Sequence, residues 1–384
     1  MERKLVPWMA LLVLGAACGS EEQSPSPAPT PAPGPAEPAE PTPAAEGNPQ
    51  AGENAPAEAQ EQTFEQRAAA APAVAPTPAA QTAGTMTVTA QVCTLDGPEL
   101  VGEDSFRAVG PVAVTPDGHL YLIDAQYKVR RYTVQPGEGC ALQMDTTLGE
   151  GGLLGLGEGL GRRPESITSD ARGHVFVSSS MNGTWRITGT NTDYHCQETR
   201  GKLTINGQGS VGFALFGSGT PQKVSFTDTG CSVAEWTYSE PFERVDSVTF
   251  VGNRVLLGGS DNAEGRPGPH LARFYNEAGA PQGARFGDTT DNLSAADHFC
   301  HVHGGVECRA GLCVVDGNCR KVRVFNNNRE VQGIVDLMRL LGLRYPWIAG
   351  VTPPRQGTAY VSSVQERGQG TRVYQGLVFR VTGL

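Results

Sequence analysis

Short runs of alternating hydrophobic residues, separated by turns, recur along most of the chain. The clearest example is Gly110–Thr133, where this pattern predicts strands at Val112–Val114, Leu120–Ile123 and Val129–Tyr132. The sequence Pro116-Asp117-Gly118 between the first two strands is typical of a tight turn. The stretch therefore predicts three consecutive antiparallel strands of one sheet.

The same pattern repeats toward the C-terminus. Residues 163–188 align with this template at an offset of 55, and weaker copies are predicted at 210–238, 245–274, 303–325 and 348–381. Repeats of about 40–55 residues indicate a propeller or a solenoid, because each unit buries its sheet faces only against its neighbours. We therefore expect an all-β fold, a β-propeller of about six blades.

The two ends of the repeat region predict that the ring is closed. The chain ends on a third strand, Leu377–Leu384, that has no fourth strand after it. Met86–Val92 alternates like a strand but has no neighbouring partner in the sequence. Placing Met86–Val92 outermost in the last blade completes that blade and removes an open sheet edge. The predicted propeller is therefore residues 86–384, closed by strand 86–92.

Two of the repeats resemble the core of the NHL repeat. In that core an aspartate ends the second strand, and a basic, aliphatic and aromatic third strand follows. Asp316–Phe325 (DGNCRKVRVF) and Asp124–Tyr132 (DAQYKVRRY) are similar to it. The resemblance implies an NHL-like six-bladed propeller, but it fixes no function, because such folds include binding proteins, lyases, lactonases and scaffolds. We expect both aspartates to brace the loop after the second strand.

The N-terminal residues are of a different kind. Residues 19–85 consist almost entirely of Ala, Pro, Glu, Gln, Gly, Thr and Ser, with too little apolar surface to offset the entropy of ordering them. We expect a disordered, Pro/Ala/Glu-rich tether there. Residues 1–18 combine two basic residues, an apolar run and a small-residue end, which is typical of a secretion signal.

The end of this signal resembles that of a bacterial lipoprotein, in which a cysteine is acylated and becomes the mature N-terminus. Cys18 follows Gly15-Ala16-Ala17, and Gly15 stands where leucine is usual. The resemblance implies a lipid anchor on Cys18 as the membrane partner. The presence of Gly19 in place of aspartate implies the outer membrane, with the protein at its periplasmic face or at the cell surface. A cleaved signal with a chance cysteine is the alternative.

The net charge of −10 belongs mostly to the tether. Residues 1–85 hold ten of the 40 acids and three of the 30 bases, so the remainder carries about 30 − 27, or three, excess acids. A fold this close to neutral has no strong field for nucleic acid. We predict no nucleic-acid partner.

Eight cysteines follow Cys18, and an even number in an exported chain indicates disulfides. The repeat register places Cys308 and Cys313 across one hairpin, and Cys300 and Cys319 at one rim, which predicts the pairs Cys308–Cys313 and Cys300–Cys319. The pairing of Cys93, Cys140, Cys196 and Cys231 stays open. A metal site that uses Cys300, His301, His303, Cys308 and Cys313 is the disfavoured alternative.

The register also predicts which side chains meet at the mouth of the central channel. The start of each innermost strand should lie there, and the polar residues at or near these positions are Glu165, Asp246, His301 and His303. In one hypothesis, carboxylates of this set hold Ca²⁺, as in propeller lactonases, and the ion polarises an ester carbonyl. In the other, they are solvated residues of a wet channel.

No dense catalytic motif occurs in the sequence. We therefore favour a non-catalytic module that binds a small molecule or a partner protein on the envelope and needs no cofactor. A calcium-dependent lactonase or esterase is the alternative.

Overall fold

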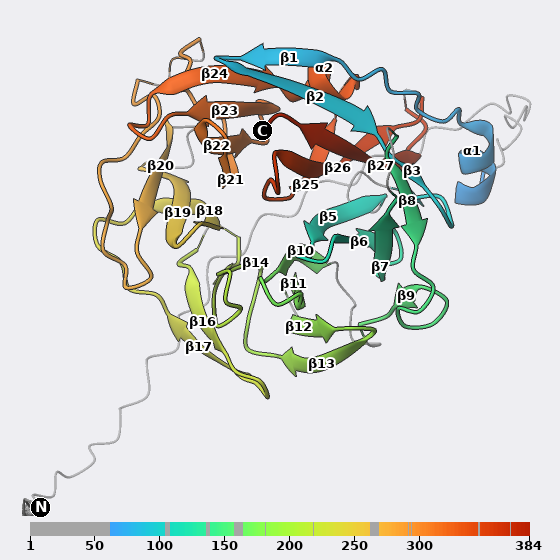
Figure 1. Cartoon of the computed structure of the whole chain (residues 1–384), viewed down its shortest axis with the longest axis horizontal. Coiled ribbons are helices and arrows are strands. Elements are labelled where there is room, and N and C mark those ends of the chain that lie inside the picture. Colours follow the sequence, from blue (N-terminus) through green and yellow to red (C-terminus); the bar gives the residue numbers. More distant parts are fainter. Residues whose placement is uncertain are drawn as a thin grey trace, which may run out of the picture. The chain divides into compact units, whose positions relative to one another are not determined.

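Six sheets surround a central channel, and in Figure 1 they follow one another around the ring in chain order. The computed structural model describes residues 62–384 apart from 104–107, 136–138, 157–163, 181, 218, 262–268, 291, 293, 345 and 369. They belong to one unit of the chain, Gln60–Leu384. The prediction of an all-β, six-bladed propeller is confirmed.

The first three blades each contain four strands from innermost to outermost. Blade 1 contains β5 (Val109–Val114), β6 (His119–Asp124), β7 (Val129–Val134) and β8 (Ala141–Met144), with β3 (Thr94–Leu95) and β9 (Leu153–Leu154) paired to its outer strands. Blade 2 contains β10 (Pro164–Ser169), β11 (Val175–Ser179), β12 (Gly183–Thr188) and β13 (Asn191–Cys196). Blade 3 contains β14 (Lys202–Ile205), β15 (Val211–Leu215), β16 (Gln222–Phe226) and β17 (Cys231–Glu235).

The last three blades differ in their outer strands. Blade 4 contains β18 (Arg244–Val251), β19 (Arg254–Ser260) and β20 (His270–Tyr275). Blade 5 contains β21 (Val302–Cys308), β22 (Gly311–Asp316), β23 (Lys321–Phe325) and β24 (Val331–Asp336), followed by helix α2 (Leu337–Leu341). Blade 6 contains β25 (Trp347–Val351), β26 (Thr358–Glu366), β27 (Tyr374–Thr382), β2 (Met86–Val92) and β1 (Ala80–Ala83), and β4 (Val101–Gly102) also pairs with β27.

The hydrophobic core lies between the blades. Each of six buried clusters joins side chains of two neighbouring blades; Val314 and Phe325 of blade 5, for example, pack with Leu256 and Phe274 of blade 4. Because the side chains of a strand alternate between the two faces of its sheet, the central strands bury both faces. This arrangement explains why the central strands are nearly continuous hydrophobic runs.

The ring closes through the predicted strand, although β1 and not β2 is the outermost strand of blade 6. β2 pairs antiparallel with β27 in the register Thr89↔Thr382 and Val92↔Phe379, so an N-terminal strand joins the last blade. Closure removes the edge that a chain ending at β27 would leave open.

Ordered structure begins upstream of the predicted boundary at residue 86, which corrects the prediction of a tether that reaches residue 85. Helix α1 (Phe64–Ala70) and β1 both lie inside the predicted tether. β1 pairs with β2 across a hairpin, and the side chain of Gln81 exchanges hydrogen bonds with the backbone of Asp336 in blade 5. Contacts with residues far away in the sequence thus order this segment despite its low content of apolar residues. Residues 1–61, including the predicted signal and Cys18, lie outside the described residues.

Candidate functional site

The innermost strands of all six blades line a cavity of about 430 Å³ along the central channel. We call the end where these strands begin the entrance end, and the end where they finish the exit end. In Figure 1 the innermost strands of the six blades surround the centre of the ring. The channel is the natural place to look for a ligand site, because it is concave and every blade contributes to it.

A β-bulge lies near the start of the innermost strand in five blades. The shifts in register fall between Val109 and Val112, Pro164 and Ser166, Val245 and Ser247, Val302 and Gly304, and Ile348 and Gly350. A bulge changes the direction of a side chain relative to the regular pleat. Three residues predicted at the channel mouth, Glu165, Asp246 and His303, lie at these bulges, and so does Pro111.

Glu165 and His303 line the channel as predicted, together with Lys202 of blade 3. The sequence prediction does not include Lys202, because the third repeat is predicted to begin at residue 210 and the short innermost strand β14 precedes it. A signal was present, since Lys202–Ile205 alternates polar and apolar residues after Gly201. Pro111 and Gly350 line the channel from blades 1 and 6. The entrance therefore combines a polar arc from blades 2, 3 and 5 with small residues from blades 6 and 1.

The imidazole of His303 is held neutral. Burial is the main cause that lowers its pKa, to about 4, and the charges of Lys202 and His301 act in the same direction, while Asp246 opposes them. Near pH 7 the ring can therefore donate one hydrogen bond and accept another. At this position the polar arc offers a hydrogen-bonding group and not a cation.

Asp246 does not line the described channel, which differs from the prediction. Its carboxylate is almost fully buried and lies 2.8 Å from Nε of Arg244, 3.0 Å from Nδ1 of His270 and 3.6 Å from Nε2 of His301. Burial alone would raise the pKa of Asp246, but the neighbouring His270 and His301 and the charge of Arg244 hold it well below its usual range. His301 likewise contacts Asp246, and its ring centroid lies 4.9 Å from that of His303. Asp246 thus joins blade 4 to the segment that leads into blade 5.

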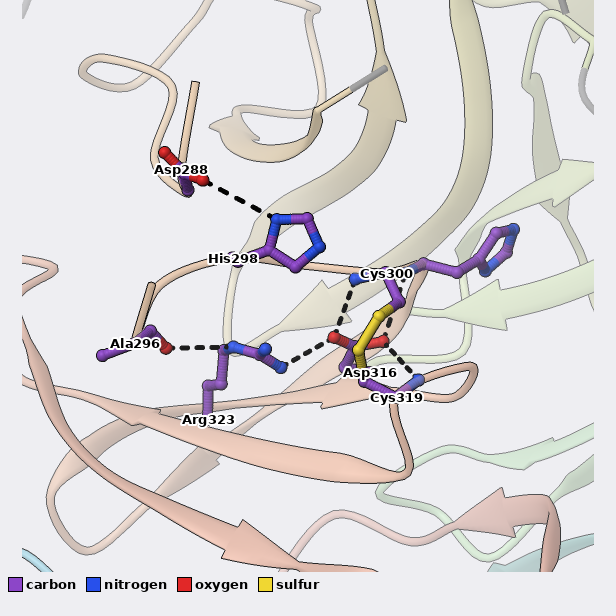
Figure 2. The surroundings of a disulfide bond; sticks show 8 residues. Asp288, Ala296, His298, Cys300, Asp316, Cys319 and Arg323 are labelled. Atoms are coloured by element: carbon purple, nitrogen blue, oxygen red, sulfur yellow. Dashed lines mark hydrogen bonds and ion pairs between the residues drawn. A yellow bond between two sulfur atoms is a disulfide. The ribbon is translucent and has the colours of Figure 1, made fainter. Parts of the chain in front are cut away.

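Asp316 fixes the segment before β21, as Figure 2 shows. Its fully buried carboxylate accepts hydrogen bonds from the backbone amides of Cys300, His301 and Cys319 at 2.9, 3.1 and 3.2 Å, and from Nη1 of Arg323 at 2.7 Å. The aspartate and the basic third strand of the NHL-like motif thus form a buried ion pair, Asp316–Arg323. It holds the backbone from which His301 and His303 project.

Asp124 plays the same part in blade 1. Its carboxylate accepts hydrogen bonds from the amides of Gln126 and Lys128 and forms an ion pair with Arg130 at 2.9 Å. The expectation that both aspartates brace the loop after the second strand agrees with these contacts.

The eight cysteines after Cys18 form four disulfides. The structure joins Cys300 to Cys319 and Cys308 to Cys313, the pairs that the register predicts. The remaining pairs, which the sequence left open, are Cys93–Cys140 and Cys196–Cys231. Because all eight sulfurs are bonded in pairs, none of these cysteines is left as a thiolate for the alternative metal site. Disulfides of this number are typical of extracytoplasmic domains.

The predicted calcium ligands are not gathered at one point. Within the described ranges, one group of three His, Cys, Asp or Glu residues has ligand atoms that all lie within 4.8 Å of one another, namely Cys300, Asp316 and Cys319. Two members of that group share a disulfide. Glu165, Asp246 and His303 belong to no such group, and Ca²⁺ needs several oxygens at 2.3–2.6 Å. These residues do not fit the calcium site that the lactonase hypothesis requires.

Comparison with known proteins assigns the chain to no family. No family model matches the chain, and no curated protein matches its sequence. Among solved structures, a chain from the crystal structure of the nidogen–laminin complex aligns at 14% identity with a TM-score of 0.41, covering 64% of this chain and 84% of that one. The described segments contain no helix with the length and apolar character to cross a bilayer.

Proposed function

We propose that the protein is an envelope-anchored binding module whose ligand enters the central channel from the entrance end. The observation that carries the proposal is the channel itself, a cavity of about 430 Å³ lined by all six innermost strands. Cavities of some hundreds of Å³ with a few polar groups in an otherwise apolar wall are typical of small-molecule sites. Glu165, Lys202 and His303 would orient polar groups of the ligand, and the small residues opposite would accept its apolar part.

Ligand screening with a blocked channel tests this proposal. We would record thermal shifts of the exported chain, carrying Cys18→Ser, with a panel of sugars, short peptides and carboxylic acids. Ala349 lines the entrance, so Ala349→Phe places an aromatic ring in the channel. Asn191→Phe adds the same ring at the exposed first residue of β13 in blade 2 and serves as the control. A ligand that stabilises the parent and the control but not Ala349→Phe supports the proposal; a ligand that stabilises all three binds elsewhere.

The anchor is tested separately. If Cys18 is lipidated, the expressed parent should partition into the membrane fraction, and mass spectrometry of its N-terminal peptide should show acyl chains. Two or more chains give stable anchoring. A Cys18→Ala variant that stays in the membrane fraction would overturn the anchor.

A further inference from the structure

A second cavity, of about 490 Å³, lies at the exit end between blades 4 and 5. Its wall combines the start of β19, the β21–β22 hairpin and the β23–β24 turn, with Phe274 of β20 behind them. Three arginines line it, Arg254, Arg309 and Arg329, together with one carboxylate, Glu307. The wall is therefore strongly cationic, although the whole fold is close to neutral.

Two of these arginines are held against the same aromatic ring. The guanidinium carbons of Arg254 and Arg329 lie 4.1 and 5.2 Å from the ring centroid of Phe274. Contact of a guanidinium with an aromatic face is favourable, and it restricts the cation to one place. The Arg329 guanidinium is fixed further, because it donates hydrogen bonds to the carbonyl oxygens of Gln282 and Ala284. The cations are thus positioned before any ligand binds.

The positive charge is not balanced within the pocket. Among the described residues, no carboxylate lies within ion-pair distance of Arg254, Arg309 or Arg329, and Glu307 is exposed and pairs with none of them. Burial, followed by the charges of Arg254 and Arg273, lowers the pKa of Arg329. Adding an anion would relieve this repulsion between like charges.

We propose that this exit-end pocket binds an oxyanion group, a phosphate, sulfate or carboxylate carried by a ligand. The planar guanidinium offers parallel N–H donors that match two oxygens of such a group. The guanidinium of Arg254 makes no hydrogen bond to the described residues, so its N–H donors are available to a ligand in the pocket. The Cys308–Cys313 disulfide fixes the hairpin that carries Arg309.

Titration calorimetry on the full exported chain tests the proposal. Sodium sulfate, sodium phosphate and sodium citrate would be titrated separately at constant ionic strength in sodium chloride. We expect saturable 1:1 binding of at least one of them, and the anion that binds most tightly identifies the chemical source of the oxyanion. Absence of saturable binding by all three would overturn the proposal.

Matched variants show whether the heat comes from this pocket. Arg254→Gln and Arg309→Gln should each weaken binding by about 10- to 150-fold, the usual effect of losing one charge-assisted hydrogen bond. Arg254→Lys keeps the charge but not the paired donors and should be intermediate. Arg172→Gln, at an exposed exit-end turn of blade 2, is the control and should bind like the parent. Equal affinities in all four variants would place the anion elsewhere and overturn the proposal; circular dichroism in chloride confirms that each variant is folded.

Discussion

Replacing Asp316 by asparagine should destabilise the propeller and loosen the entrance end. The side chains of Asp316 and Arg323 are 0% and 1% exposed, so their ion pair is fully removed from water. Removing one partner of such a pair typically costs about 3–5 kcal/mol, because the other charge stays buried without compensation.

The geometry explains why asparagine is a poor substitute. One carboxylate oxygen, Oδ1, accepts from the amides of His301 and Cys319, while the other, Oδ2, accepts from the amide of Cys300 and from Arg323. Asparagine keeps one acceptor oxygen and puts an NH₂ group in place of the second. That NH₂ group would face two donors. Two charge-assisted hydrogen bonds at about 1.5–3 kcal/mol each lead to the same range.

The free energy of unfolding would be measured by urea titration, followed by tryptophan fluorescence, for the parent and for Asp316→Asn. Hydrogen exchange should rise at the amides of Cys300 and His301. Asp117→Asn, at a turn where the carboxylate is 64% exposed, is the control and should change stability by less than about 0.5 kcal/mol. A loss below about 1 kcal/mol for Asp316→Asn, with exchange unchanged, would refute the assignment of Asp316 as the residue that fixes this segment.

A double variant separates the ion pair from the backbone contacts. Arg323→Met removes the buried cation, so Asp316→Asn should cost less in that background than in the parent. If the cost is the same in both backgrounds, the destabilisation comes from the backbone hydrogen bonds alone.

Two further predictions concern pH and the disulfides. Because folding lowers the pKa of His303 to about 4, the unfolded chain binds one more proton between pH 6.5 and 4, and the free energy of unfolding should fall by about 2–3 kcal/mol as the pH drops through that window. In urea titrations at pH 7, 5.5 and 4, His303→Gln should lose less stability than the parent. Parallel pH profiles of the two proteins would contradict this prediction. The entropy cost of closing a loop grows with its length, and the separation is 47 residues for Cys93–Cys140 and 5 residues for Cys308–Cys313. Replacing both cysteines by serine should therefore cost about 4 kcal/mol for the first disulfide and about 2 kcal/mol for the second. The reverse order in urea titrations would contradict the entropic account.

Features that depend on the repeat register could be predicted from the sequence. The ring closure follows because a lone strand and an incomplete blade complement each other. The pair Cys308–Cys313 could be predicted because both residues lie at one hairpin. The pair Cys300–Cys319 could be predicted because the repeat places both residues at the same rim of the propeller. Register alone specifies these positions, without knowledge of any side-chain direction.

Features that depend on side-chain direction or on weak strands could not be predicted. Asp246 aligns with the channel-lining residues, but its carboxylate lies among Arg244, His270 and His301. The alignment specifies the position at the bulge, while the neighbouring charges decide where the side chain turns. The strand that carries Lys202 has only four residues and lacks the turn sequence of the Gly110–Thr133 repeat. β1 is held by contacts with Asp336, which is far away in the sequence.

The arginines of the exit-end pocket show why repeat alignment alone does not reveal such a site. Arg254 begins a second strand, Arg309 lies in a hairpin, and Arg329 lies in the turn after a third strand, so no two of them occupy equivalent positions of the repeat. They converge because blades 4 and 5 pack face to face around Phe274. Packing of the blades does not require a particular residue at positions that differ from one blade to the next. Unbalanced charge at such positions is therefore better explained by a ligand than by the fold, and this is the reasoning that the Arg254 and Arg309 variants test.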